Sequence, residues 1–285
     1  MSEDRPEPLT LTGADGLRLA ADAWGEPGAP PVLLMHGGGQ TRHSWGGTAQ
    51  ALAALGFRAI AVDARGHGDS DRDPERRYTA PAFAADLAAL AASFDRPPAV
   101  VGASLGGNSA LLAHGDLGVP LGAAVFVDIG PKVELSGVQR IYSFMQARPD
   151  GFASLDEVAD AVAAYQPHRE RPRDTSGLAK NLRLGSDGRW RWHWDPAFLE
   201  VMFQPQPHLA SRIDAAARNL TCPVLLVRGK LSDLLSEENV RVFLELCPHA
   251  EFVDVAGAGH MVAGDVNDRF TAAVSEFLVR RFRAA

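Results

Sequence analysis

A serine between two glycines, at the junction of a predicted strand and a predicted helix, constrains this chain more than any other feature. Residues 102–106 read Gly-Ala-Ser-Leu-Gly, directly after the apolar run Ala99–Val101 and before the helix-compatible run Asn108–His114. A serine in so tight a turn takes an unfavourable backbone conformation, and only neighbours without a Cβ leave room for it. We therefore expect Ser104 to present its hydroxyl at the carboxyl end of a strand, beside the first amides of a helix.

Apolar runs alternate with amphipathic runs along most of the 285 residues, which predicts an α/β protein. With 46% hydrophobic residues, a chain of this length can bury a sizeable core. The later strand candidates are continuous Val, Ile, Leu and Ala runs, as in parallel strands covered on both faces. The expected strands are Leu9–Thr12, Leu17–Ala23, Pro31–Met35, Arg58–Val62, Ala99–Val101, Ala123–Val127, Val224–Val227 and Glu251–Val255. The expected helices are Trp45–Leu55, Pro81–Ser93, Asn108–His114, Glu237–Leu246 and Asp268–Arg281.

The alternation stops between residues 131 and 219, where no clear strand is predicted. This segment contains several prolines and a group of aromatic residues: Tyr142, Phe144, Trp190, Trp192, Trp194, Phe198 and Phe203. We expect residues 131–219 to form a helical lid over the carboxyl edge of the sheet. Residues 1–130 and 220–285 would then form the core domain.

Charge and cysteine content exclude several classes of partner. The formal net charge of −7 disfavours nucleic acid and anionic membrane surfaces. Cys222 and Cys247 suggest buried thiols rather than a disulfide framework, and no histidine–carboxylate cluster has metal-binding spacing. The start of the chain is polar and acidic, and no apolar run reaches the ~18–20 residues that span a bilayer. We therefore expect a soluble cytoplasmic protein without a metal or cofactor, and a homodimer is left open.

Two further segments carry the residue types that a serine nucleophile needs. Asp233 lies on a loop after the strand Val224–Val227, and His260 lies on a glycine-rich loop after the last predicted strand. A neutral imidazole can remove the serine proton during attack, and a carboxylate fixes the tautomer of that imidazole. All three residues follow strands at one sheet edge, in the order serine, acid, histidine. The sequence therefore predicts a triad of Ser104, Asp233 and His260.

A fourth segment, His36-Gly37-Gly38-Gly39, comes straight after the strand Pro31–Met35. Glycines let backbone N–H groups approach a substrate, and such donors stabilise a tetrahedral oxyanion, at about 3–4 kcal/mol of barrier per donor lost. We assign the oxyanion hole to the amides of Gly38 and Leu105, with Gly39 as a further candidate.

Several residues admit another interpretation. Asp128 ends the strand Ala123–Val127 and is the alternative acid, although Asp233 is favoured because its loop precedes a helix. His36 is expected to be structural, and His193 either faces the pocket or packs within the lid. In the segment 63–70, we expect Asp63, Arg65 and Asp69 to brace a turn.

The motifs His-Gly-Gly-Gly, Asp-x-Arg-Gly-x-Gly-x-Ser and Gly-x-Ser-x-Gly together resemble those of the α/β-hydrolase superfamily, over residues 10–130 and 220–283. The resemblance is to its lidded members, which include esterases, cofactor-free perhydrolases, C–C bond hydrolases and epoxide hydrolases. It implies a mostly parallel eight-stranded sheet, with the first two helices and the last helix on opposite faces. Family epoxide hydrolases and haloalkane dehalogenases use an aspartate nucleophile, so the serine at position 104 argues against both chemistries.

These observations predict a serine hydrolase that cleaves a carboxylic ester or related acyl compound of small to medium size. The alternatives are a C–C bond hydrolase of ring-cleavage products, which uses the same triad, and a non-catalytic binding protein on this fold. The aromatic lid indicates an apolar substrate. The candidate pocket residues are Gly39, Phe144, Met145, Trp190, Trp192 and Trp194.

Overall fold

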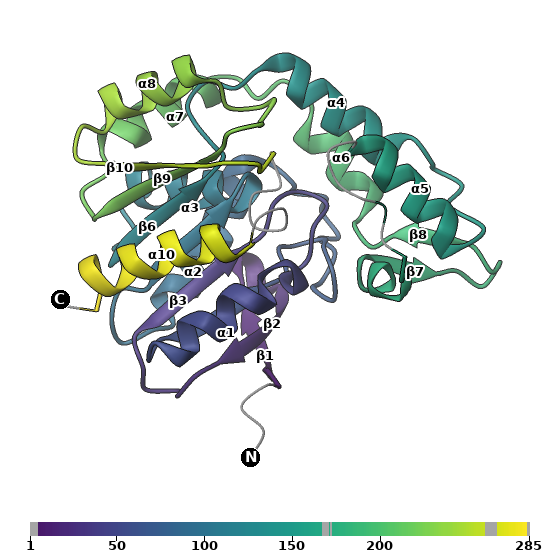
Figure 1. The fold of residues 1–285 in the computed structure, drawn as a ribbon, viewed down its shortest axis with the longest axis horizontal. Helices are drawn as coiled ribbons and strands as arrows, with labels where there is room; N and C mark the ends of the chain where they lie inside the picture. The colour runs from purple at the N-terminus through teal and green to yellow at the C-terminus, as the bar shows by residue number, and fades with distance from the viewer. Residues whose placement is uncertain (1–4, 167–170, 172, 260–266, 284–285) are drawn as a thin grey trace.

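An eight-stranded sheet forms the centre of the computed structural model, which describes residues 5–166, 171, 173–259 and 267–283 (Figure 1). Its strand order is β1-β2-β4-β3-β5-β6-β9-β10. β2 pairs antiparallel with β1 and β4, and every other pair is parallel. The bounds are β1 Glu7–Thr12, β2 Arg18–Trp24, β3 Pro31–Met35, β4 Arg58–Val62, β5 Ala99–Ala103, β6 Ala123–Val127, β9 Val224–Gly229 and β10 Glu251–Val255. The predicted eight-stranded, mostly parallel sheet is confirmed.

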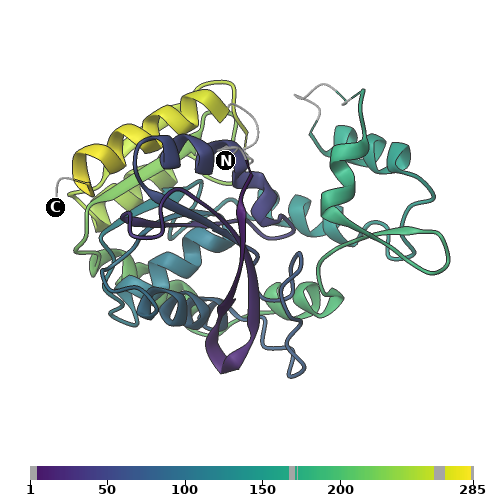
Figure 2. The same ribbon diagram turned by 90° about the horizontal axis from the view of Figure 1, so that it is seen from below.

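Helices cover both faces of this sheet, and each helix buries its apolar side against the strands (Figure 2). The core helices are α1 Gly46–Ala54, α2 Ala80–Ala92, α3 Leu105–Gly115, α8 Glu237–Leu246 and α10 Asn267–Arg281. One apolar cluster joins α1 and α10 through Leu52 and Phe277, and the other joins α2, α3 and α8. The expectation that the first two helices share a face is therefore wrong, because α1 and α2 lie on opposite sides. The last helix lies on the face of α1.

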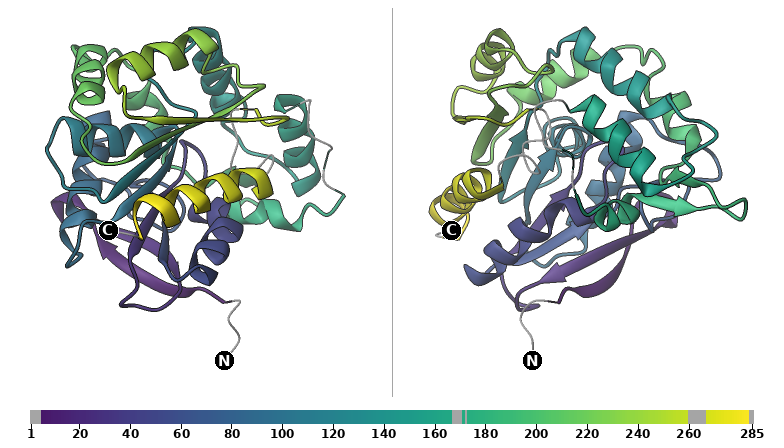
Figure 3. Two further views of the ribbon diagram at one scale, coloured as in Figure 1. Left: turned by 60° about the vertical axis from the view of Figure 1, so that its left-hand side comes forward. Right: turned by 45° about the vertical axis from the view of Figure 1, so that its right-hand side comes forward.

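A separate layer stands at the carboxyl edge of the sheet, to the right in Figure 1 and beside the strand ends in Figure 3. We call residues 135–202 of this layer the lid. It consists of α4 Leu135–Gln146, α5 Leu155–Tyr165, the 3-10 helix η3 Ser176–Asn181, the hairpin of β7 Leu182–Leu184 and β8 Trp190–Trp192, and α6 Pro196–Met202. The described part of the lid is thus mainly helical. The expectation of no strand is wrong, because each strand of the hairpin has only three residues and is too short to show alternation.

The last helix of the predicted insertion, α7 Leu209–Arg218, packs on the core. Its Ala216 and Ala217 are fully buried in the cluster that also contains α3. A Cβ on Gly115 of α3 would lie 2.1 Å from the Ala216 carbonyl oxygen, so glycine is needed for this close contact.

Within the described residues, no helix combines the length and apolarity needed to cross a membrane.

The turn between β5 and α3 holds Ser104 in the left-handed half of conformational space, with φ 45° and ψ −108°. A non-glycine residue in such a region is strained by on the order of 1–3 kcal/mol. The flanking glycines allow the turn, because Gly102 and Gly106 face each other closely. A Cβ on Gly102 would lie 2.6 Å from the Gly106 carbonyl carbon, and one on Gly106 would lie 2.3 Å from the Met35 carbonyl oxygen.

We predict that Gly106→Ala lowers the free energy of unfolding by about 3 kcal/mol, because the new methyl group collides with backbone that cannot move aside. This collision outweighs the roughly 1 kcal/mol that alanine gains over glycine in a helix. Chemical denaturation measures the change. Gly28→Ala is the matched control, because a Cβ at Gly28 has nothing within 4 Å. Equal stability of the two variants would contradict the steric argument.

A second prediction concerns the strain at Ser104. Ser104→Gly relieves the unfavourable φ, whereas Ser104→Ala keeps it and removes the same hydroxyl. We expect the glycine variant to unfold at a higher denaturant concentration, with a free energy of unfolding about 1 kcal/mol above that of the alanine variant. An alanine variant at least as stable as the glycine variant would show that the turn stores no strain.

Candidate active site

The carboxyl edge of the sheet brings Ser104, the loop after β3 and Asp128 together. Ala103 and Val127 are partners in the β5–β6 register, so the next residues, Ser104 and Asp128, leave the sheet side by side. The Ser104 N–H donates to the Val127 carbonyl at 3.1 Å. On the other side, a Cβ at Gly37 would lie 3.4 Å from the Ser104 Cβ. The predicted nucleophile therefore lies between the β3 loop and the end of β6.

Two backbone amides beside Ser104 are left for a ligand. The Gly106 N–H donates to the His36 carbonyl at 3.1 Å, and the Gly37 N–H donates to the Gln40 side chain at 2.9 Å. Within the described part of the chain, the N–H groups of Gly38 and Leu105 have no hydrogen-bond acceptor. These are the two amides assigned from the sequence to an oxyanion hole.

Gly39, the further candidate, is arranged differently from Gly38. Its N–H donates to Nε2 of His67 at 3.1 Å. Its carbonyl accepts from Nε2 of His193 at 3.2 Å. Because the amide of Gly39 is engaged by a side chain, it is not free to bind a substrate oxygen in this conformation.

The two candidate acids lie in contrasting environments. Asp128 is fully buried, has φ 52°, and accepts a hydrogen bond from the Ser232 hydroxyl at 2.5 Å. The side chain of Asp233 is 41% exposed and forms an ion pair with Arg140 of α4 at 2.7 Å. The backbone of the same loop touches α4, where a Cβ on Gly137 would lie 2.5 Å from the Asp233 carbonyl oxygen. Position and burial thus favour Asp128 over Asp233 as the carboxylate nearest to Ser104 in the sheet.

The third member of the predicted triad, His260, lies outside the described residues. The strand before it, β10, pairs in parallel with β9, and Val255 is the partner of Gly229. The described chain leading toward position 260 therefore starts from the same edge as Ser104 and Asp128.

The lid closes over the glycine loop with apolar side chains. A Cβ on Gly39 would lie 2.8 Å from the Met145 Cε and 3.2 Å from the Trp194 Cζ3. A Cβ on Gly38 would lie 3.3 Å from Cζ of Phe198. Met145, Trp194 and Phe198 belong with Leu105 to one buried cluster between core and lid. The predicted pocket residues Met145 and Trp194 are thus adjacent to the glycine loop.

The other predicted pocket residues lie further into the lid. Trp192 stacks on Trp194, with ring centroids 5.0 Å apart, and also packs against Phe144 at 5.6 Å. Phe144 stacks on Tyr165 of α5 at 4.2 Å. Trp190 belongs to the outer cluster around Phe152. These three side chains therefore support the apolar side of the lid from behind, and Met145 and Trp194 form its surface at the glycine loop.

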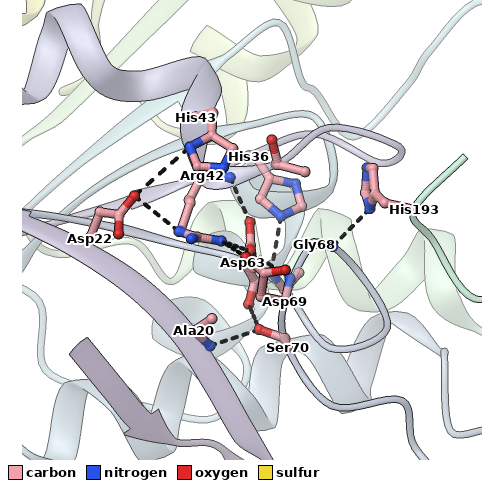
Figure 4. A network of polar contacts seen from close by, with 12 residues as sticks. Ala20, Asp22, His36, Arg42, His43, Asp63, Gly68, Asp69, Ser70 and His193 are labelled. Atoms are coloured by element: carbon pink, nitrogen blue, oxygen red, sulfur yellow. Dashed lines mark hydrogen bonds and ion pairs between the residues drawn. The ribbon is translucent and has the colours of Figure 1, made fainter. Parts of the chain in front are cut away.

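A buried polar network supports the turn after β4, as Figure 4 shows. Asp63 is fully buried, pairs with the Arg42 guanidinium, and accepts from the N–H groups of Arg42 at 2.7 Å and Asp69 at 2.9 Å. Arg65, also fully buried, binds Asp86 through two bonds of 2.6 Å. The Asp69 side chain is 53% exposed, so it contributes to the rim of this turn rather than to its interior.

Three buried histidines connect this turn with the glycine loop and the lid. The His36 Nε2 accepts from the Ala64 N–H at 2.9 Å, and the His193 Nδ1 accepts from the Gly68 N–H at 2.7 Å (Figure 4). Burial lowers the pKa of His67 to about 3 and that of His193 to about 2, and it also lowers the pKa of His36. A charged imidazole could not accept these backbone N–H groups, so the contacts and the low pKa values agree.

Sequence reasoning left the lid–core contacts largely unassigned. The Asp195 N–H donates to the Gly66 carbonyl at 2.8 Å, and the Asp195 carboxylate accepts from the Tyr78 hydroxyl at 2.7 Å. The Asp-Pro start of α6 is an N-cap signal, but nothing in the sequence links it to Tyr78.

Among the described residues, no group of three or more His, Cys, Asp or Glu side chains could hold a metal ion.

Comparison with known proteins gives one consistent answer. A family model described as the alpha/beta hydrolase fold matches residues 30–265. An esterase of Mycobacterium tuberculosis is 30% identical over 255 residues, which cover 87% of this chain and 82% of the esterase. A 2-(acetamidomethylene)succinate hydrolase of Mesorhizobium japonicum is 34% identical over 210 residues, covering 72% of this chain and 73% of that protein. The crystal structure of an alpha/beta hydrolase of Novosphingobium aromaticivorans has a TM-score of 0.81 and 28% identity, covering 98% of this chain and 99% of its own. The chain belongs to the alpha/beta hydrolase fold family.

Proposed function

We propose that this protein is a serine hydrolase that cleaves carboxylic esters through an acyl-enzyme. The observation that carries the proposal is the strained turn that presents Ser104 between the amides of Gly38 and Leu105, which have no acceptor among the described residues. A nucleophile beside two backbone donors is the arrangement that a tetrahedral intermediate requires. The similarity to an esterase over most of both chains supports the same chemistry.

In this mechanism the Ser104 Oγ attacks the substrate carbonyl carbon while an imidazole takes its proton. His260, proposed from the sequence, is that base. The carbonyl oxygen gains negative charge and accepts hydrogen bonds from the N–H groups of Gly38 and Leu105. The imidazolium then protonates the leaving alcohol. A water molecule, activated by the same histidine, releases the carboxylic acid and restores Ser104.

We propose Asp128, rather than Asp233, as the carboxylate that orients His260. An acid with this role has to be desolvated so that its charge stabilises the imidazolium. Asp128 is fully buried next to the Ser104 turn, whereas Asp233 is exposed and its charge is compensated by Arg140. The sequence favours Asp233 because of its place before a helix, a position that says nothing about burial.

The substrate would bind with its apolar part against the lid. Met145, Trp194 and Phe198 cover the glycine loop, and each is at most 6% exposed. These three side chains belong with Leu105 to one buried apolar cluster. We therefore propose esters of small to medium size with an apolar acyl or alcohol part as the substrate class.

We expect the protein to hydrolyse p-nitrophenyl butyrate and to be labelled by a fluorophosphonate at one site. Ser104→Ala should lower kcat by several orders of magnitude and abolish the labelling, because no other group supplies the covalent intermediate. Ser93→Ala, in the C-cap of α2, is the control and should behave as the unaltered protein. Absence of labelling in folded protein, or faster turnover of a vinylogous diketone than of any ester, would overturn the proposal.

The assignment of the acid is tested by a pair of isosteric variants. Asp128→Asn should reduce kcat on the order of 10⁴-fold, since an amide can no longer stabilise the imidazolium. Asp233→Asn should change kcat by less than about tenfold, because it removes only an exposed ion pair worth about 0–1 kcal/mol. Thermal melting of both variants shows whether they are folded. If Asp233→Asn were the more damaging change, the acid would be Asp233.

A further inference from the structure

Gly39 is bound at both of its backbone polar groups by histidine side chains from two different parts of the fold. His67, on the turn after β4, accepts the Gly39 N–H, and His193, in the lid between β8 and α6, donates to the Gly39 carbonyl. We infer that His67 and His193 are positioning residues that set the orientation of the Gly38 amide by holding Gly39. This inference rests on the proposed function, because it concerns the oxyanion donor of that reaction.

The hydrogen bonds assign opposite tautomers to the two rings. A backbone N–H can only donate, so Nε2 of His67 has no proton, and its Nδ1–H donates to the Arg65 carbonyl at 3.0 Å. Nδ1 of His193 accepts from Gly68, so its Nε2 carries the proton and donates to Gly39. Both nitrogens of each ring are occupied by backbone groups. Neither ring has a nitrogen left to take a proton from a substrate, which excludes a role as catalytic base.

The position of Gly39 matters because the residue before it, Gly38, carries the N–H group proposed as the oxyanion donor. The Gly37 carbonyl accepts from Nδ1 of His36 at 2.8 Å and from the Gln40 N–H at 3.1 Å. In a planar trans peptide the N–H points opposite to the C=O, so these bonds direct the Gly38 N–H away from His36. Gly39 has φ +77°, a conformation that allows the chain to turn immediately after that amide. The donor is therefore held from His36 on one side and from the His67–His193 pair on the other.

His193 makes the arrangement of the oxyanion loop dependent on the lid. The ring is 3% exposed, and it bridges the lid to both Gly68 and Gly39. Arg183 of β7 binds the same turn at the Gly68 carbonyl and Asp69, at 2.7 and 2.6 Å, and among the described residues no hydrogen bond joins it to Gly39. Arg183 therefore connects the lid to the same turn as His193 does, but in the described part of the chain it makes no hydrogen bond to the oxyanion loop.

Substitution by asparagine or by glutamine tests separately the two hydrogen bonds that each histidine makes. The amide group of asparagine occupies the place of Nδ1, and that of glutamine occupies the place of Nε2. In both histidines Nε2 is the atom that faces Gly39, so His67→Gln and His193→Gln keep that contact, whereas the two asparagine variants keep only the other bond. We expect kcat for p-nitrophenyl butyrate to fall between about tenfold and a hundredfold in the asparagine variants, with KM little changed, and to be largely retained in the glutamine variants.

Melting temperatures and Arg183→Gln serve as controls for general loosening of the lid. Arg183→Gln should leave kcat close to that of the unaltered protein. Equal losses of kcat in the glutamine and asparagine variants, or losses that track melting temperature and extend to Arg183→Gln, would overturn the inference. If the unaltered protein hydrolysed no ester, the proposed function would fail instead.

Nitrogen chemical shifts of the imidazole rings provide a test that needs no activity and no variant. We expect His67 to carry its proton on Nδ1 and His193 on Nε2, with both rings neutral between pH 5 and 8, the range around the ordinary pKa of about 6.5. A proton on either nitrogen that we assign as an acceptor, or a charged ring in this range, would contradict the inference.

Discussion

Two hydrogen bonds at the start of α3 determine the geometry of the sheet edge. The Ser104 N–H is bound by the Val127 carbonyl of β6, and the Gly106 N–H is bound by the His36 carbonyl after β3. The amide between them, that of Leu105, has no acceptor in the described part of the chain. Because α3 is tied to a strand on each side, the strained serine and the free amide keep one relative position. This rigidity is what an oxyanion site needs, since its donors act only if they require no reorganisation.

The polar turn after β4 extends this rigidity to the lid. Arg65 is fully buried against Asp86 and Asp73, and removing one partner from such a pair costs about 3–5 kcal/mol. The same turn offers the Gly66 carbonyl and the Gly68 N–H to Asp195 and His193 of the lid. The buried charges therefore fix a surface on which the second half of the lid is held by directional bonds. The first half, α4, is attached through the buried Met145, an exposed ion pair and a close backbone contact at Gly137.

Much of the core could be predicted from the sequence, because its pattern is local. Strands such as Pro31–Met35 and Ala123–Val127 are continuous apolar runs, and their observed bounds agree with those expected. The hairpin β7–β8 could not be predicted, since three-residue strands carry too little periodicity. The side of the sheet on which α1 lies depends on strand order, which a single sequence does not show. The lid–core hydrogen bonds from Gly68 to His193 and from Tyr78 to Asp195 join residues more than a hundred positions apart and leave no local pattern.

The choice between the two candidate acids illustrates the same limit at the site. Asp128 and Asp233 both follow a parallel strand, so a pattern of strand ends cannot separate them. Their difference is tertiary: Asp128 leaves the sheet in register with Ser104, whereas the loop of Asp233 runs outward to meet α4, where Arg140 compensates its charge. A carboxylate that is solvated and already paired has little free energy left to stabilise an imidazolium. If Asp128 is the acid, as we propose, burial at a strand end separates the two candidates where position in the chain does not. The core provides that burial, and the lid provides the apolar wall of the site.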